Sequence, residues 1–159
     1  MSKRNEALQH VADVLVGNWK LTMTNAWFWE NPAEIIEGSA TVAWLDDAFL
    51  IVRWSVGEES ESIWVLSRSD ARDAFIALTY DERGVLRVFD MTFTGAGGEW
   101  LLTREDPDFY QRLVGTISAD GNRIDTHPDA SEDNGKTWRK DYDLTFERRA
   151  ERTMPPDAG

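Results

Sequence analysis

Three charged residues, Arg53, Arg87 and Asp90, interrupt otherwise apolar runs of this 159-residue chain and are the best candidates for chemistry. Tyr80 and Tyr142 are candidate hydrogen-bond donors within similar segments. A charge that points into a protein interior needs a partner or a ligand group, because an isolated buried charge is costly. Each of the three can also face solvent on the outer wall of a sheet, so both interpretations stay open.

Other chemistries have little support in the sequence. There is no cysteine and only two histidines, which removes thiolate catalysis and leaves carboxylates as the remaining metal ligands; we expect no metal site and no cofactor. No Gly-rich phosphate loop or nucleophile elbow occurs. The segment 131–138, Ser-Glu-Asp-Asn-Gly-Lys-Thr-Trp, has the chemistry of a tight turn, in which Asp133 accepts backbone N–H groups and Asn134-Gly135 supplies positive φ angles.

One helix and a series of short strands must position these residues. Apolar residues at helical spacing predict a helix over 5–16 that ends at a left-handed Gly17. From Trp19 onward the apolar period is two, which indicates half-buried strands. Further strands are expected at about 35–45, 49–57, 61–68, 73–80, 84–94, 98–104, 109–118, 122–127 and 138–148, with turn residues between them.

Strands that follow one another without helical crossovers pair in sequence, and closing the sheet removes its unpaired edges. We therefore predict an all-β fold, a closed antiparallel up-and-down barrel of about eight to ten strands, with the N-terminal helix plugging one end. A two-sheet sandwich is the alternative. Residues 1–150 are expected to form one domain, and 151–159, with Pro155-Pro156, a flexible tail.

The two ends of the chain resemble a known superfamily. Gly17-Asn18-Trp19 is similar to the Gly-x-Trp signature that opens the first strand of lipocalins and other calycins. The segment 137–149, with Trp138 and an arginine pair at its end, resembles the closing strand of a bacterial lipocalin-like family of unknown function. The resemblance implies that Trp19 lies at the barrel floor, and that Arg148 or Arg149 covers its indole. Some lipocalin-like barrels hold haem through one late histidine, here His127, which is a minor alternative.

The position of the helix at one end of the barrel also indicates which loops surround the open end. Alternate loops, at about 25–34, 57–61, 81–84, 105–108 and 129–136, should surround the open end. They carry thirteen acidic residues against Arg83 and Lys136, which predicts an acidic rim that repels anions. The first of them holds Trp27-Phe28-Trp29, three aromatics that cannot all face one way and could form a lid.

Net charge excludes several partners. At −12, with no stripe of Lys and Arg, the chain is a poor ligand for nucleic acid or for an anionic membrane surface. No apolar run is long enough to span a bilayer, and no secretory signal is evident at the N-terminus, so a cytoplasmic protein is expected, as a monomer or a homodimer.

The sequence therefore predicts a barrel that binds a small apolar or amphipathic, non-anionic molecule in its cavity. The alternative is an isomerase- or cyclase-type enzyme acting on a hydrophobic substrate in the same cavity. A module that binds a partner through the aromatic loop is a third possibility. The candidates for lining the pocket or its mouth are Trp19, Met23, Trp27, Trp29, Arg53, Trp54, Trp64, Tyr80, Arg87, Phe89, Met91, Trp100 and Tyr142.

Overall fold

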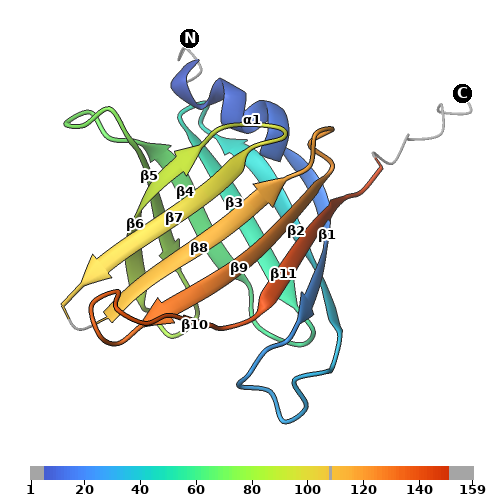
Figure 1. The fold of residues 1–159 in the computed structure, drawn as a ribbon. Helices are drawn as coiled ribbons and strands as arrows, with labels where there is room; N and C mark the ends of the chain where they lie inside the picture. Colours follow the sequence, from blue (N-terminus) through green and yellow to red (C-terminus); the bar gives the residue numbers. More distant parts are fainter. Residues whose placement is uncertain (1–5, 108, 151–159) are drawn as a thin grey trace, which may run out of the picture.

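The computed structural model describes residues 6–107 and 109–150, and within them the chain forms a closed antiparallel barrel (Figure 1). The elements are η1 (Glu6–Leu8), α1 (Gln9–Leu15), β1 (Gly17–Thr24), β2 (Ile36–Leu45), β3 (Phe49–Val56), β4 (Ser62–Arg68), β5 (Phe75–Tyr80), β6 (Leu86–Phe93), β7 (Glu99–Asp106), β8 (Phe109–Ile117), β9 (Arg123–Ser131), β10 (Arg139–Lys140) and β11 (Asp143–Arg148). The predicted tail, 151–159, lies outside the described residues.

The strand order confirms the predicted up-and-down barrel. Each strand from β1 to β9 pairs with the next along the chain, and β11 closes the sheet between β9 and β1. Ten strands thus surround the interior, while the two-residue β10 pairs only with the end of β9. The sandwich alternative is therefore wrong.

The N-terminal helix covers one end of the barrel, as expected, but it is shorter than the sequence predicted. A 3-10 turn precedes α1, and Leu8, Val11 and Leu15 are fully buried against the barrel core. Gly17 follows the C-cap Val16 with a positive φ of 139°, and it is also the first residue of β1. A Cβ there would lie 2.9 Å from Arg148 Nη1, so the glycine leaves room for that guanidinium.

Strand β9 runs four residues past its predicted end, straight through Pro128. Up to Thr126 it pairs with β11, and from Asp129 it pairs with β10. Pro128 lies where β9 changes its partner strand. Asp141 N donates to Pro128 O there, and the pairing on the side of β10 and β11 needs no N–H from residue 128. The proline thus permits the strand to continue rather than ending it.

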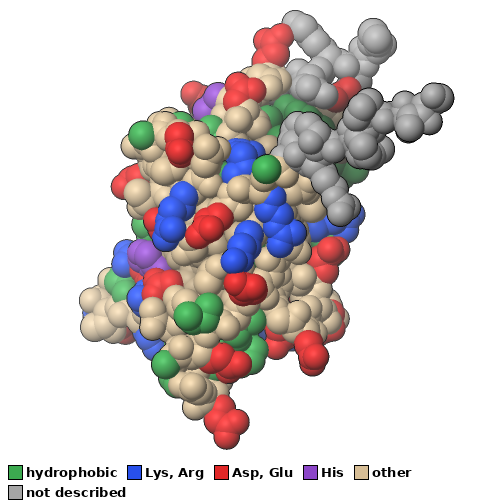
Figure 2. All heavy atoms as spheres, turned by 90° about the vertical axis from the view of Figure 1, so that its right-hand side faces the viewer, with side chains coloured by type: hydrophobic (Ala, Val, Ile, Leu, Met, Phe, Trp, Pro, Cys, Tyr) green, Lys and Arg blue, Asp and Glu red, His purple; other side chains and the backbone are tan. Residues whose placement is uncertain are grey.

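The outer wall of the barrel has two different halves. Across β9, β11, β1 and β2 it is polar, with Lys20 paired to Glu37 at 2.8 Å and Arg123 paired to Asp125 at 3.0 Å. Figure 2 shows this face with basic and acidic side chains intermixed. Across β5 and β6 it is apolar instead, with Leu86 and Val88 half exposed. No helix in the described part of the chain has the length and apolarity to cross a membrane.

Candidate functional site

The closed end of the barrel is sealed by Trp19 and Arg148. Trp19 is 1% exposed, and its Nε1 donates to Leu15 O at 2.8 Å. The Arg148 guanidinium lies 4.2 Å above the indole, and it donates to the backbone oxygens of Val14 and of Val16, the latter at 3.0 Å. Burial lowers the pKa of Arg148. Trp19 is therefore part of the floor.

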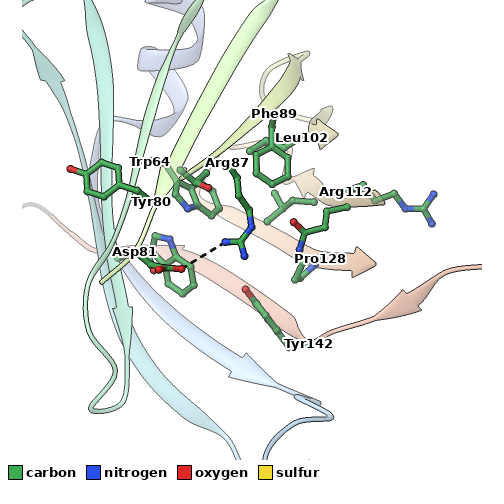
Figure 3. Close-up of a pocket in the computed structure, with 14 residues that line it drawn as sticks. Trp64, Tyr80, Asp81, Arg87, Phe89, Leu102, Arg112, Pro128 and Tyr142 are labelled. Atoms are coloured by element: carbon green, nitrogen blue, oxygen red, sulfur yellow. Dashed lines mark ion pairs between the residues drawn. The ribbon is translucent and has the colours of Figure 1, made fainter. Parts of the chain in front are cut away.

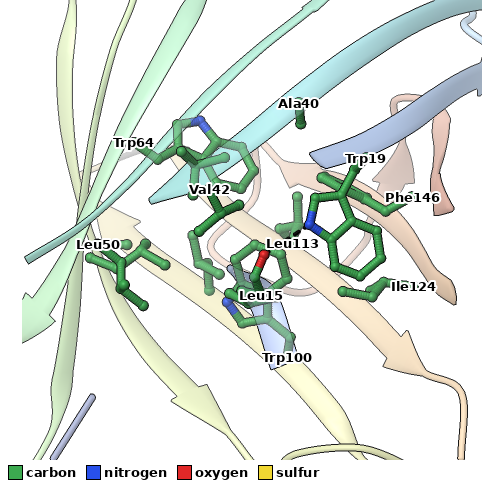
Figure 4. Packing of buried hydrophobic residues seen from close by; sticks show 14 of the residues in the cluster. Leu15, Trp19, Ala40, Val42, Leu50, Trp64, Trp100, Leu113, Ile124 and Phe146 are labelled. Carbon is green, nitrogen blue, oxygen red and sulfur yellow. Dashed lines mark hydrogen bonds between the residues drawn. The ribbon is translucent and has the colours of Figure 1, made fainter. Parts of the chain in front are cut away.

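Aromatic rings fill the barrel from this floor upward (Figure 4). Trp19 contacts Phe146, Phe146 contacts Trp100, and Trp100 contacts Trp64, with ring centroids 5.9 to 6.3 Å apart. Trp64 in turn contacts Trp54 at 5.9 Å, edge to face. Tilted or perpendicular pairs of this kind contribute about 0.5–1.5 kcal/mol each beyond their burial. Around this aromatic column the interior is thus a packed core, and an open space lies above Trp64.

That space is a cavity of about 240 Å³ at the end opposite α1 (Figure 3). Its walls are mainly apolar, and one side carries a guanidinium and a carboxylate. Fourteen residues line it: Trp54, Ser62, Trp64, Thr79, Tyr80, Asp81, Arg87, Phe89, Leu102, Gln111, Arg112, Leu113, Pro128 and Tyr142. A volume of this size holds one or two small rings.

A second hollow of about 490 Å³ adjoins the cavity and leads outward. The two share Trp54, Ser62, Asp81 and Tyr142. Its outer wall includes Phe28 and Trp29 from the loop between β1 and β2, together with the 59–60 and 82–83 turns. The cavity therefore communicates with solvent through an aromatic entrance.

Arg87 is the principal charged group inside the cavity. Alternation along β6 puts it on the inner face, with the buried Phe89 and Met91. Its Nη1 lies 3.7 Å from Asp81 Oδ2, too far for a hydrogen bond, and its guanidinium makes no hydrogen bond to any described residue. Burial, with the charges of Arg104 and Arg83, lowers the pKa of Arg87.

Tyr142 supplies the second polar group of the cavity. Figure 3 shows its hydroxyl directed toward Arg87 and Asp81. Burial and the charge of Asp141 raise the pKa of Tyr142, so the phenol stays protonated at neutral pH. A protonated phenol beside a guanidinium offers donors to a ligand oxygen.

Arg104 lies beside this group on β7. Its guanidinium lies 5.7 Å from the centroid of the Phe89 ring and 5.6 Å from that of Phe109, and it bonds to Asp106 and Gln111. Its Nε is buried with no hydrogen-bond partner among the described residues, as are Trp29 Nε1 and Trp54 Nε1. Trp54 lines both hollows and Trp29 the outer one, whereas Arg104 lines neither, and Trp100 Nε1 in the packed core is also without a partner among the described residues.

The sequence candidates separate into groups by position. Six line the cavity: Trp54, Trp64, Tyr80, Arg87, Phe89 and Tyr142. Met23 and Trp29 line the outer hollow, with Trp54 and Tyr142. Trp19, Met91 and Trp100 belong to the packed core, each at most 2% exposed.

Several expected site residues face away from the interior. Arg53 lies on the outer face of β3 and pairs with Glu61 at 3.1 Å, and Asp90 on β6 pairs with Arg72 at 2.8 Å. Alternation between the two faces of each strand puts them there, since their neighbours Val52 and Phe89 point inward. Tyr80 touches the cavity rim but is 42% exposed, and its hydroxyl points away from the other labelled side chains in Figure 3.

The three consecutive aromatics of the first loop, which is not a strand, point in different directions. Trp27 packs on the outside, with its Nε1 donating to Asp141 Oδ1 at 3.0 Å and Arg139 4.3 Å from its ring centroid. Phe28 is 52% exposed and contacts the Tyr142 ring at 6.0 Å. Trp29 lines the outer hollow. Only Phe28 and Trp29 are placed to cover a ligand.

His127 does not face the cavity. It shares the outer face of β9 with Asp129, whose Oδ1 lies 2.9 Å from His127 Nδ1. The buried Asp129 also pairs with Arg112 at 2.8 Å, and Trp138 stacks on that guanidinium at 4.0 Å. A haem inside the barrel therefore finds no ligand in His127.

The acidic rim stays a prediction, but counting loop residues alone missed the strand arginines. Arg87, Arg104 and Arg112 reach the same end from β6, β7 and β8. Asp106 pairs with Arg104, and Asp129 pairs with Arg112. Asp81 pairs with Arg83 at 2.6 Å, and this hydrogen bond lowers the pKa of Asp81. Several rim carboxylates are thus neutralised locally.

Sequence reasoning missed the remaining wall of the cavity, chiefly Asp81, Leu102, Gln111 and Pro128. Asp81 was counted only as a rim charge. Leu102 could have been found from its alternation with Trp100 on β7, since both point inward. Pro128 could not, because the strand was predicted to end before it.

The described residues contain no cluster of three or more His, Cys, Asp or Glu side chains arranged to hold a metal ion. A scan against models of known protein families found no match, and a search of curated proteins found no similar sequence. The barrel, with its N-terminal helix and Trp19 floor, is compatible with a calycin-like fold.

Proposed function

We propose that this protein binds a small apolar or amphipathic molecule in the cavity at the open end of the barrel, as a lipocalin-like binding protein. The observation that carries the proposal is an aromatic cavity of about 240 Å³ that opens through a second hollow and holds polar groups without partners. Ligand pockets combine apolar walls with a few such polar groups, which orient the ligand.

The charge that the cavity favours in a ligand depends on the side chains inside it rather than on those of the surrounding loops. The loop sequence favoured a non-anionic ligand, but the strand arginines neutralise several of those carboxylates. Exposed charges at the entrance are also screened within about 8 Å at physiological salt. Arg87 lies in the cavity wall itself, so its attraction for an anionic group outweighs the repulsion by the rim carboxylates.

Titration with the uncharged two-ring dye prodan (6-propionyl-2-dimethylaminonaphthalene) tests this proposal. We expect saturable enhancement of dye fluorescence with one site per chain. Ser62→Phe, which puts a ring into both hollows, should abolish it. Ser39→Phe is the matched control, because Ser39 is exposed on the outer face of β2. Equal binding by both variants would place the dye elsewhere and refute the proposal.

Catalysis in the same cavity is a second candidate, favoured by the perturbed pKa values of Arg87 and Tyr142. Perturbed groups in a cleft are typical of active sites. In such an enzyme Arg87 would polarise a substrate oxygen and Tyr142 would donate a hydrogen bond to it. Arg53 and Asp90, on the outer wall, would have no part. Turnover of a bound compound, followed by NMR and abolished in Tyr142→Phe, would establish catalysis in the cavity.

A further inference from the structure

We propose that the polar group of the ligand is a carboxylate on a flat aromatic body, held by Arg87. This inference rests on the proposed function, because it specifies what the cavity binds.

The first argument is the pairing of charges around the cavity. Arg83 and Asp81 form a close pair at 2.6 Å, and Arg112 and Asp129 another at 2.8 Å. Arg104 is paired with Asp106. The nearest anionic atom to Arg87 is Asp81 Oδ2, 3.7 Å from its Nη1, and that oxygen already accepts a hydrogen bond from Arg83.

One positive charge is therefore in surplus inside the cavity. The lowered pKa of Arg87 agrees with this, since burial and two neighbouring arginines disfavour its charged form. A guanidinium nonetheless stays protonated at neutral pH, and its planar fork matches the two oxygens of a carboxylate. An anionic group would supply the missing partner.

The second argument is an excess of donors over acceptors. Trp54 Nε1, beside both hollows, and Trp29 Nε1, beside the outer one, are buried without hydrogen-bond partners among the described residues. The Tyr142 hydroxyl also makes no hydrogen bond to a described residue and is directed toward the Arg87 side of the cavity (Figure 3). Buried donors are normally satisfied, so a molecule rich in acceptors fits this site.

The third argument concerns shape. Trp64 and Phe89 form aromatic walls, and Leu102 and Leu113 close the cavity toward the core. Below Trp64 the barrel is occupied by Trp100 and Phe146, which leaves no channel for a long chain. The cavity itself, about 240 Å³ and closed toward the core, accommodates one or two fused rings, whereas the tail of an extended fatty acid would be left in the outer hollow.

Isothermal titration of the wild-type protein with four probes tests the inference: 2-naphthoate, 2-naphthamide, 2-naphthylmethylammonium and dodecanoate. We expect 2-naphthoate to bind at least about tenfold more tightly than the amide, because a charge-assisted bidentate contact replaces a neutral one. The ammonium and dodecanoate should bind more weakly than either.

A variant pair locates the effect. Arg87→Met keeps the aliphatic stem and should remove the preference for naphthoate over naphthamide. Arg53→Met removes an arginine from the outer wall and should leave the preference unchanged. The comparison among probes uses the wild-type protein, so it stands even if a variant fails to fold.

The outcomes separate the two proposals. Equal affinity for naphthoate and naphthamide, or a preference for the ammonium, would overturn the carboxylate inference and leave the binding function intact. Tighter binding of dodecanoate would overturn the aromatic part. Failure of all four probes and of the uncharged dye to bind would refute the binding function itself.

Discussion

Replacing Arg148 by Met should destabilise the closed end of the barrel. The guanidinium stacks 4.2 Å above Trp19 and donates to the oxygens of Val14 and Val16 at the end of α1. It also bonds to Asn122 Oδ1 at 3.1 Å. One side chain thus joins the helix, the first strand and the turn between β8 and β9.

The magnitude follows from these contacts. A cation–π contact contributes about 0.5–2 kcal/mol. Each hydrogen bond to a charged donor contributes about 1.5–3 kcal/mol, less where water can replace the donor. Since Arg148 is only partly buried, we expect a loss of about 3 kcal/mol in the free energy of unfolding. With a urea slope of about 2 kcal/mol/M, the midpoint falls by about 1.5 M.

Urea unfolding followed by tryptophan fluorescence measures this shift. Arg149→Met is the control, because Arg149 is exposed. Arg148→Lys keeps the charge but loses the fork, and should fall between wild type and Arg148→Met. A midpoint for Arg148→Met equal to that of Arg149→Met would refute the role assigned to Arg148 in sealing the floor.

Two further predictions concern the turns and the sheet. Asp133→Asn should lower the thermal unfolding temperature at pH 7; hydrogen bonds from Thr137 lower the pKa of Asp133 from 3.8 to about 2, so this stabilisation is present above pH ~4 and disappears as the pH falls to about 2. If the gap between variant and wild type persisted unchanged at pH 2, the hydrogen-bonding argument would fail. Gly38→Ala should cost about 3 kcal/mol or more, because its Cβ would lie 2.0 Å from Ser55 O and 2.7 Å from Val56 Cα, both backbone atoms. Ser39→Ala, one residue along β2, is the control in urea unfolding, and an equal midpoint for the two variants would contradict the contact.

The sequence predicted the barrel because its signals were local. Turn residues at Gly95 to Gly98 and at Asp120-Gly121 separate the strands where expected, and Gly97, Gly121 and Asn134 do adopt positive φ angles. The 131–138 turn formed as its chemistry required, with Thr137 N donating to Asp133 Oδ1 at 2.8 Å. Each of these features depends on a few neighbouring residues.

The inner wall could not be predicted because the outer wall is also apolar. On β3 and β4 the outward Ile51 and Val65 are as apolar as the inward Val52 and Trp64, so alternation carries no signal there. On β6 near the mouth, the charged Arg87 faces inward and the apolar Leu86 and Val88 face solvent, which is the reverse of the usual pattern. Only the three-dimensional register shows which charged residue enters the cavity.

The polar side chains that meet at the cavity come from segments that are distant in the sequence. Asp81 and Arg83 lie in one turn, but Arg104 comes from β7 and Tyr142 from the segment before β11. A count of charges by loop cannot see these pairings, and for that reason it overestimated the acidity of the rim. The aromatic column from Trp54 to Trp19 is likewise invisible in a sequence where eight tryptophans are spread along the chain.

The indole N–H signals in a ¹H–¹⁵N NMR titration with 2-naphthoate test the central claim, a binding site at the open end of the barrel, most directly. Trp54 and Trp64 line the cavity, whereas the Nε1 of Trp19 is bonded within the floor and that of Trp27 to Asp141 on the outside. The account predicts large shifts for Trp54 and Trp64 with Trp19 and Trp27 unmoved. Shifts confined to Trp27, or none at Trp54 and Trp64 under saturation, would contradict it.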